Sequence, residues 1–148
     1  MSARAAAVLF LLTFGGGCSP FRPLLLGDTA VSPDLIRRAG RSTDPRLDEP
    51  LLRILDARIA MPDDLAAAAR AQAAALALAE RRTTAAVPRL AALSVDPDPA
   101  VRCGILEALA RLGGAEAEAT LRRVAATDPD PRARSLAARL GGSRAERE

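Results

Sequence analysis

Residues 96–113 read DPDPAVRCGILEALARLG, and residues 128–142 read DPDPRARSLAARLGG. The two stretches align through the turn without a gap, at a displacement of 32 residues (96 to 128). Three aspartate/arginine pairs share this register along the chain, namely Asp64/Arg70, Asp96/Arg102 and Asp128/Arg134. A period of about 20 to 50 residues is typical of supersecondary units that stack because each is too small to bury its own apolar face. The sequence therefore predicts a repeat protein.

Each clear copy is predicted to form two helices joined by an Asp-Pro-Asp-Pro turn. Apolar residues recur at helical spacing on both sides of the turn, for example at Val101, Ile105 and Leu109 after it. Asp98 suits the N-cap, where its carboxylate accepts backbone N–H groups, and Pro99 suits the first helical position, where no N–H is missed. A glycine pair then supplies left-handed residues that end the second helix.

An earlier, degenerate copy precedes these two. Apolar residues between Leu51 and Ile59 form one helical stripe, and a turn follows at Pro62. An alanine-rich helix is expected over residues 65–82. Its small side chains allow close backbone approach but bury little area per residue. Atypical terminal copies are the usual caps of a solenoid.

The last copy departs from the pattern as well. Leu140 comes six residues after Arg134, whereas Leu112 comes ten residues after Arg102. This shortening predicts the loss of one helical turn in the last helix. We expect one repeat domain over residues 50–142, followed by a disordered tail at 143–148.

The stretch from Asp96 to Gly113 resembles the HEAT repeat, in particular the short bacterial HEAT-like form that is also found in bilin lyases. The resemblance implies an all-α fold, a short right-handed α-solenoid of about three HEAT-like helical hairpins. It also implies that the turn aspartate and the arginine six residues later form a hydrogen-bonded ladder between successive units. The ladder residues would be Asp64, Arg70, Asp96, Arg102, Asp128 and Arg134.

Residues 1–17 do not belong to the repeats and have the layout of an export signal. Arg4 gives a positive start, residues 5–14 are apolar, and three glycines follow. A helix needs about 20 apolar residues to span a bilayer, so this segment is too short for a membrane-spanning anchor. Small residues directly before Cys18 resemble the lipobox of bacterial lipoproteins, although Gly15 stands where leucine is usual.

The lipobox resemblance implies that Cys18 carries diacylglycerol and becomes the mature N-terminus. Ser19 resembles the pattern that sorts lipoproteins to the outer membrane, which implies a cell-envelope protein anchored at the periplasmic face of that membrane. Ordinary secretion and a buried N-terminal element are the alternatives. Residues 18–49 contain several prolines and mostly lack a periodic apolar face, so we expect the lipidated cysteine and a flexible tether there.

The composition of the chain leaves little material for catalysis. Its 148 residues include 21 basic and 18 acidic side chains, and every basic one is arginine because lysine and histidine are absent. The commonest general base, the Schiff-base amine and the commonest metal ligand are therefore missing. Paired carboxylates stand at the helix starts, where capping explains them, and no calcium-binding loop is present. We expect no catalytic residue, no metal and no cofactor.

Cys103 is the second of two cysteines, and it has two interpretations. Beside Arg102 its thiolate would be favoured, as at a reactive site. Alternatively it is a small buried apolar residue, because Ala71 and Ser135 occupy the same register. We favour the second interpretation.

The arginines of the chain raise the question of nucleic acid binding. Arginine pairs at 37/38, 81/82 and 122/123 could contact phosphates. However, the repeats contain no aromatic residue to stack a base, and the net charge is only +3. We therefore expect these pairs to lie on solvated helix faces and expect no nucleic acid partner.

The leading hypothesis is a non-enzymatic, lipid-anchored helical-repeat module that binds another envelope protein, as an adaptor or assembly factor. Its binding face would be the concave one, lined by the second helix of each hairpin, with Glu107, Arg111 and Arg139 as candidate contacts. A lyase-like accessory subunit of an enzyme is the first alternative, and a nucleic-acid-binding HEAT-like protein is the second. The partner's identity and the oligomeric state stay open.

Overall fold

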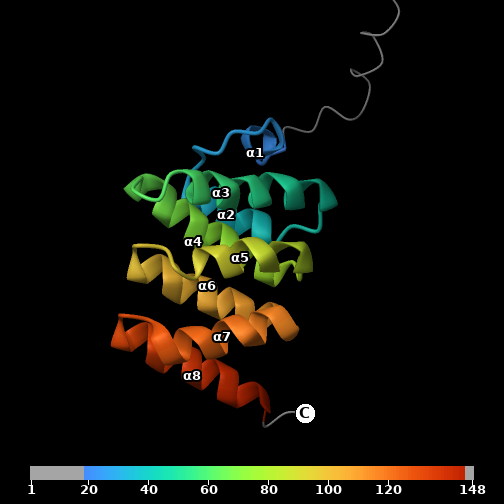
Figure 1. Ribbon diagram of the computed structural model, residues 1–148. Coiled ribbons are helices and arrows are strands. Elements are labelled where there is room, and N and C mark those ends of the chain that lie inside the picture. Colours follow the sequence, from blue (N-terminus) through green and yellow to red (C-terminus); the bar gives the residue numbers. More distant parts are fainter. Residues whose placement is uncertain (1–18, 146–148) are drawn as a thin grey trace, which may run out of the picture.

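A computed structural model describes residues 19–145, and all regular elements in this range are helices. The α-helices form one stack with α1 at one end and α8 at the other (Figure 1). The elements are α1 (Arg22–Leu25), α2 (Pro33–Gly40), η1 (Pro45–Leu47), α3 (Asp48–Ala60), α4 (Leu65–Glu80), η2 (Thr84–Ala86), α5 (Val87–Leu93), α6 (Pro99–Leu112), α7 (Ala115–Thr127) and α8 (Pro131–Ala145), where η denotes a short 3₁₀ helix.

The helices form two parallel rows. In one row α3 packs against α5 and α5 against α7, while in the other α2 packs against α4, α4 against α6 and α6 against α8. Each hairpin contributes one helix to each row, and the apolar core runs between them. The predicted all-α solenoid is therefore confirmed for the described residues, with its hairpins at α3–α4, α5–α6 and α7–α8.

The turns between the two rows are fixed by aspartate caps. The carboxylate of Asp98 accepts the N–H of Ala100 at 2.8 Å, and that of Asp130 accepts the N–H of Arg132 at the same distance. In the first hairpin Asp64 has this capping role at the start of α4. The caps therefore align Asp64 with Asp98 rather than with Asp96, and the sequence alignment of the first copy is wrong by two residues.

The predicted loss of a turn in the last helix is also wrong. Helix α8 has 15 residues, against 14 in α6. Gly113 ends α6 because its φ of 71° redirects the chain into α7, whereas Gly141 and Gly142 continue α8. The expected tail at 143–148 is corrected in part, because α8 includes residues 143–145, and residues 146–148 lie outside the described range.

The predicted flexible tether over residues 18–49 is contradicted by a folded N-terminal unit. Helix α2 buries Ile36 and Ala39 completely and packs against α4. Leu24 of α1 and Leu47 of η1 are buried in the same core. The prolines that favoured a tether instead stand at helix starts, as Pro33 does after the capping side chain of Ser32. Residues 22–40 therefore form a short folded unit that extends the stack at its N-terminal end, with α1 against α3 and α2 against α4.

Small residues allow α2 to approach α4 closely. A Cβ atom on Gly40 would lie 2.8 Å from the Cα atom of Ala77 on α4, so only glycine fits there. On the other side of α4, a Cβ atom on Gly104 of α6 would meet the side chain of Gln72 at 2.6 Å. The alanine-rich composition of α4 thus serves a helix that lies between two close neighbours.

The side chain of Arg81, after α4, holds the N-terminal unit in place. Its guanidinium donates to the main-chain oxygens of Ala39, Ser42 and Asp44, and it pairs with the carboxylate of Asp48. These carbonyls belong to the end of α2 and the segment after it, so the arginine ties this part of the chain to the end of α4. The prediction that the arginine pair at 81/82 lies on a solvated helix face is therefore wrong for Arg81, because its side chain is almost fully buried.

A core truncation tests whether the N-terminal unit belongs to the domain. Ile36→Ala removes a fully buried side chain between α2 and α4, and we expect the free energy of unfolding to fall by about 2 to 5 kcal/mol. Ile59→Ala on α3 is the matched control, since Ile59 is exposed and should cost less than about 1 kcal/mol. Urea unfolding measures both. Equal, small effects would mean that residues 22–40 are not part of the fold.

Candidate functional site

A buried guanidinium joins the second hairpin to the third. Nε and Nη2 of Arg102 donate to the two carboxylate oxygens of Asp128 at 2.9 and 3.0 Å, and Nη1 donates to the main-chain oxygen of Asp96 at 2.7 Å. Both charged side chains are almost fully buried. One arginine on α6 therefore ties together the turn of its own unit and the turn of the next unit.

The preceding rung is made by a residue that sequence analysis did not select. Nε and Nη2 of Arg58, on α3, both lie 2.7 Å from the carboxylate oxygens of Asp96, and Nη1 donates to the main-chain oxygen of Asp64 at 2.7 Å. The Arg58 and Asp96 side chains are each 1% exposed. The hydrogen bonds to Asp96 raise the pKa of Arg58 above its usual value, which keeps the guanidinium charged.

Arg70 does not form the first rung as predicted. Its guanidinium lies 3.6 Å from the carboxylate of Asp64, beyond hydrogen-bonding distance, and both side chains are partly exposed. The caps explain this difference, because the position of α4 that matches Arg102 is Ala68, four residues after the cap at Asp64. Alanine cannot reach the next turn, so Arg58 reaches it from α3 instead.

Arg58 could have been found from the sequence. It lies seven residues after Leu51 and three to four after Ile54 and Leu55, which places it on the buried stripe of its helix. A charged residue on an apolar stripe needs a buried partner. No comparable signal distinguishes the buried Arg81 from the exposed Arg82 beside it.

Arg134 occupies the last position of the ladder. Its Nη1 donates to the main-chain oxygens of Asp128 at 2.7 Å and Pro129 at 3.2 Å, as Arg102 does one unit earlier. Within residues 19–145 no carboxylate pairs with its remaining N–H groups. The ladder therefore has two complete rungs and a third arginine that holds only the turn of its own unit.

The polar groups of the ladder are occupied in holding the fold. Besides its arginine, the carboxylate of Asp96 accepts the N–H of Asp98 at 2.9 Å, and that of Asp128 accepts the N–H of Asp130 at 2.8 Å. Among the described residues, no buried side-chain polar atom lacks a hydrogen bond. Buried charges with complete partners suit a structural role better than acid–base chemistry.

The predicted contact residues lie on the row formed by α4, α6 and α8. Glu107 and Arg111 stand one turn apart on α6, and Arg139 of α8 occupies the position of Glu107 one unit later. Glu107 is partly exposed, whereas Arg111 and Arg139 are exposed. The row therefore presents both signs of charge on adjacent helices, which suits a polar protein surface.

Cys103 packs against the small apolar cluster between α6, α7 and α8. Burial raises the pKa of its thiol, and the neighbouring carboxylate of Asp130 adds to the rise more than Arg102 offsets it. The thiol therefore stays protonated at neutral pH, which is contrary to the requirement of a nucleophilic site. The structure favours the interpretation of Cys103 as a packing residue.

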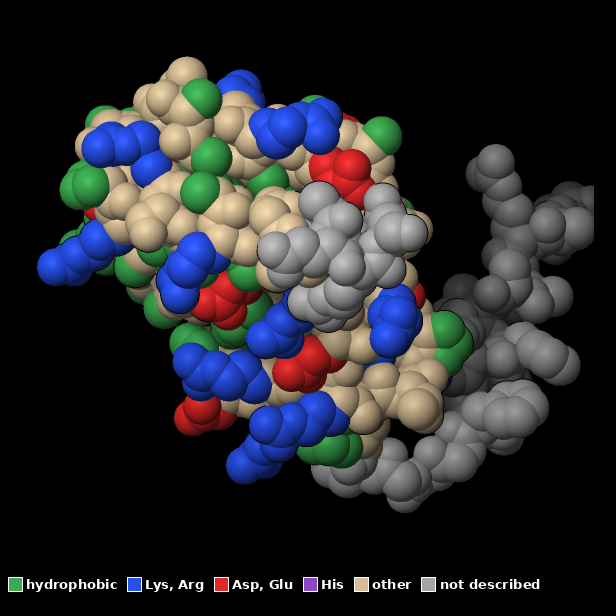
Figure 2. Space-filling view, turned by 90° about the horizontal axis from the view of Figure 1, so that it is seen from below, with side chains coloured by type: hydrophobic (Ala, Val, Ile, Leu, Met, Phe, Trp, Pro, Cys, Tyr) green, Lys and Arg blue, Asp and Glu red, His purple; other side chains and the backbone are tan. Residues whose placement is uncertain are grey.

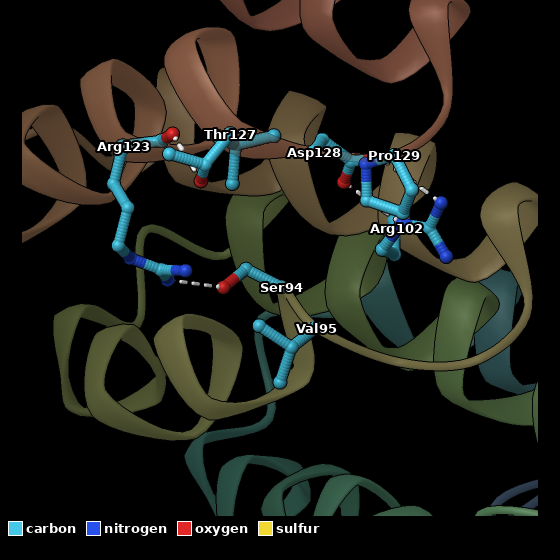
Figure 3. Close-up of a pocket in the computed structure, with 8 residues that line it drawn as sticks. Ser94, Val95, Arg102, Arg123, Thr127, Asp128 and Pro129 are labelled. Carbon is cyan, nitrogen blue, oxygen red and sulfur yellow. Dashed lines mark hydrogen bonds and ion pairs between the residues drawn. The ribbon is translucent and has the colours of Figure 1, made fainter.

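A small cleft lies beside the second rung, and sequence analysis did not predict it. Its volume is about 120 Å³, and it separates the α5–α6 turn from the end of α7 (Figure 3). Nη2 of Arg123 donates to Oγ of Ser94 across it at 2.7 Å, and Arg102 with Asp128 lines another side. The charged groups here already have partners within the protein, so nothing identifies a ligand.

The remaining sequence predictions concern membrane and metal. Cys18 and the signal at residues 1–17 lie outside the described residues. None of the helices between residues 19 and 145 combines the length and the apolar character that crossing a membrane requires. In the same range no cluster of three or more histidine, cysteine, aspartate or glutamate side chains could hold a metal ion.

The stacked hairpins and their arginine–aspartate rungs define a helical-repeat protein. The family described as HEAT repeats matches residues 55–140, more than half of the chain, and the protein belongs to that family. The match begins inside α3 and therefore leaves out the truncated N-terminal unit. A search of curated proteins finds no match. HEAT repeats indicate a helical-repeat module for protein–protein interaction.

Two arginine substitutions distinguish the observed ladder from the predicted one. Arg58→Ala leaves the carboxylate of Asp96 buried without its cation, so the free energy of unfolding should fall by about 3 to 5 kcal/mol. Arg70→Ala removes a partly exposed ion pair and should cost less than about 1 kcal/mol. Chemical unfolding followed by circular dichroism measures both. A larger loss for Arg70→Ala would contradict this assignment of the first rung.

Proposed function

We propose that this protein is a lipid-anchored adaptor or assembly factor of the bacterial cell envelope, which binds another protein on the exposed face of α4, α6 and α8. The proposal extends the family assignment in two respects, the location and the partner. The observation that supports it is the arrangement of the second row, in which the adjacent helices α6 and α8 present the polar side chains of Glu107, Arg111 and Arg139 from a firmly bonded scaffold.

The chemistry of the ladder supports a binding role. Its carboxylates and guanidinium groups are consumed by contacts between units, so they hold the spacing of the helices rather than act on a substrate. The chain also lacks histidine and lysine, the commonest general base and the commonest amine nucleophile. The residues that remain available to a partner are those on the outer surfaces of the helices.

The proposed location depends on the N-terminal sequence alone. The apolar segment before Cys18 and the small residues next to it support export and lipidation. The folded unit at residues 22–40 changes the expected geometry, because only a few residues would separate the lipid from the first helix. The repeat stack would therefore sit close to the membrane surface, with its N-terminal end toward the lipid.

Membrane fractionation in the native host tests the location. We expect the wild-type protein in the membrane fraction, with an intact mass that shows a diacylated N-terminus at Cys18. A Cys18→Ala variant should lose both the lipid and the membrane association. Full-length, soluble protein in both cases would contradict the envelope assignment.

Site-specific crosslinking in the same host tests the binding face. A photoreactive amino acid in place of Glu107 or Arg139 should give a discrete crosslinked species, because both positions lie on the α6–α8 face. The same amino acid in place of Arg122, which is exposed on α7 in the other row, is the matched control and should give none. Equal crosslinking from all three positions would reject this face as the binding site.

A further inference from the structure

The C-terminal end of the ladder repeats the arginine of a complete rung without a described carboxylate beside it. Arg58 and Arg102 each place Nε and Nη2 against both oxygens of an aspartate from the next unit. Arg134 repeats the main-chain contacts of Arg102, at 2.7 Å to its own turn, but no described carboxylate reaches its Nε and Nη2. The same sequence position is therefore occupied in one unit and open in the next.

We infer that Arg134, together with the cationic outer surface of α8, binds an aspartate in an acidic segment of the partner protein. This inference rests on the proposed function and names the chemistry of one contact. A planar guanidinium held by two main-chain carbonyls is oriented in advance, so it loses little conformational entropy when it takes a bidentate carboxylate.

The charge of α8 supports an acidic ligand. Residues 131–145 contain four arginines and no aspartate or glutamate. Arg132 and Arg139 are exposed on the same helix as Arg134, and the view of this end of the stack shows arginine side chains with acidic ones between them (Figure 2). Uncompensated positive charge on a helix surface attracts an acidic segment over a distance of about 10 Å at moderate salt.

The apolar residues of α8 argue against a further stacked helical unit as the ligand. Leu106 and Leu109 of α6 are fully buried, and Leu106 packs in the cluster that α6 shares with α7 and α8. The matching positions of α8, one unit later, are Ala138 and Gly141, and Ala138 is exposed. At the position where Leu106 contacts the next hairpin, α8 thus has an exposed alanine, yet α8 keeps the arginine that in the preceding unit binds the next aspartate.

The two occupied rungs also define the shape of the ligand. In each, the carboxylate accepts the N–H of the residue two positions later as well as the guanidinium. An aspartate followed by a tight turn therefore fits the open position, and the chain supplies such a segment in its own residues 126–131, ATDPDP. A blocked peptide of this sequence is a suitable probe.

Nuclear magnetic resonance of arginine side chains tests the contact directly. The isotope-labelled full chain is titrated with the acetylated, amidated peptide ATDPDP, and with a control peptide in which the first aspartate is asparagine. We expect the Nε–Hε resonance of Arg134 to shift saturably in the millimolar range with the aspartate peptide, while that of the exposed Arg38 on α2 moves much less. The asparagine peptide should bind with at least about tenfold lower affinity, measured by the same resonance of Arg134, because one charge-assisted pair is lost.

Variants complete the test. Arg134→Lys keeps the charge but loses the planar guanidinium, so peptide binding should be lost, whereas Arg38→Gln, at an exposed position of α2 at the other end of the stack, should keep it. Unchanged binding in Arg134→Lys, or equal shifts with both peptides, would overturn the inference. In the free protein, Glu146→Gln and Glu148→Gln should leave the Arg134 resonance in place; a shift would mean that the chain's own C-terminus fills the site, and would also overturn it.

The outcome is separable from that of the proposed function. Crosslinks at Glu107 without peptide binding at Arg134 would remove this contact and leave the adaptor proposal standing. Peptide binding at Arg134 without any position-dependent crosslink would reject the proposed binding face and leave the contact at Arg134 standing. Self-association of the chain that Arg134→Lys abolishes would show that a second copy supplies the carboxylate, which contradicts an acidic segment of a different protein.

Discussion

The structure depends on burying two arginine–aspartate pairs where one repeat meets the next. Arg58 with Asp96 and Arg102 with Asp128 are nearly inaccessible to water, so each charge would be very costly without the other. Nη1 of each arginine donates to a main-chain oxygen in the turn of its own hairpin. Apolar packing alone would allow stacked helices to slide, whereas a bidentate buried pair accepts one register, and the fixed spacing of the outer helices follows from it.

The same constraint explains how the two ends of the stack differ. At the N-terminal end the unit before α3 is anchored by Arg81, which binds main-chain oxygens instead of a carboxylate, and by the close fit of Gly40 on α4. At the C-terminal end the ladder arginine is retained without a described carboxylate partner, and the position that matches the buried Leu106 is the exposed Ala138. The N-terminal end is therefore held by the contacts of Arg81 within the chain, whereas the C-terminal end has N–H groups of Arg134 without a described carboxylate.

The sequence predicted the fold where local chemistry decides it. Asp98 and Pro99 define a helix start by capping and backbone geometry, and the repetition of this turn at Asp130 sets the period. The sequence-based predictions were wrong where the interacting residues are far apart in the chain. The burial of α2 depends on Gly40 meeting Ala77, which has no local signature. The first rung joins residues 38 positions apart, and only its arginine is marked in the sequence, by its place on an apolar stripe. The two-residue shift of the first copy followed, because Asp64 was aligned as a ladder residue when it is a cap.

A double-mutant cycle on Arg102 and Asp128 tests most directly whether the buried pair is the interaction that holds adjacent repeats. The free energy of unfolding is measured by urea for Arg102→Ala, Asp128→Ala and the double variant. Each single substitution leaves one buried charge unpaired, so the double variant should be scarcely less stable than the worse single one, with a coupling energy of about 2 kcal/mol or more. Additivity of the two losses within about 0.5 kcal/mol would contradict this account.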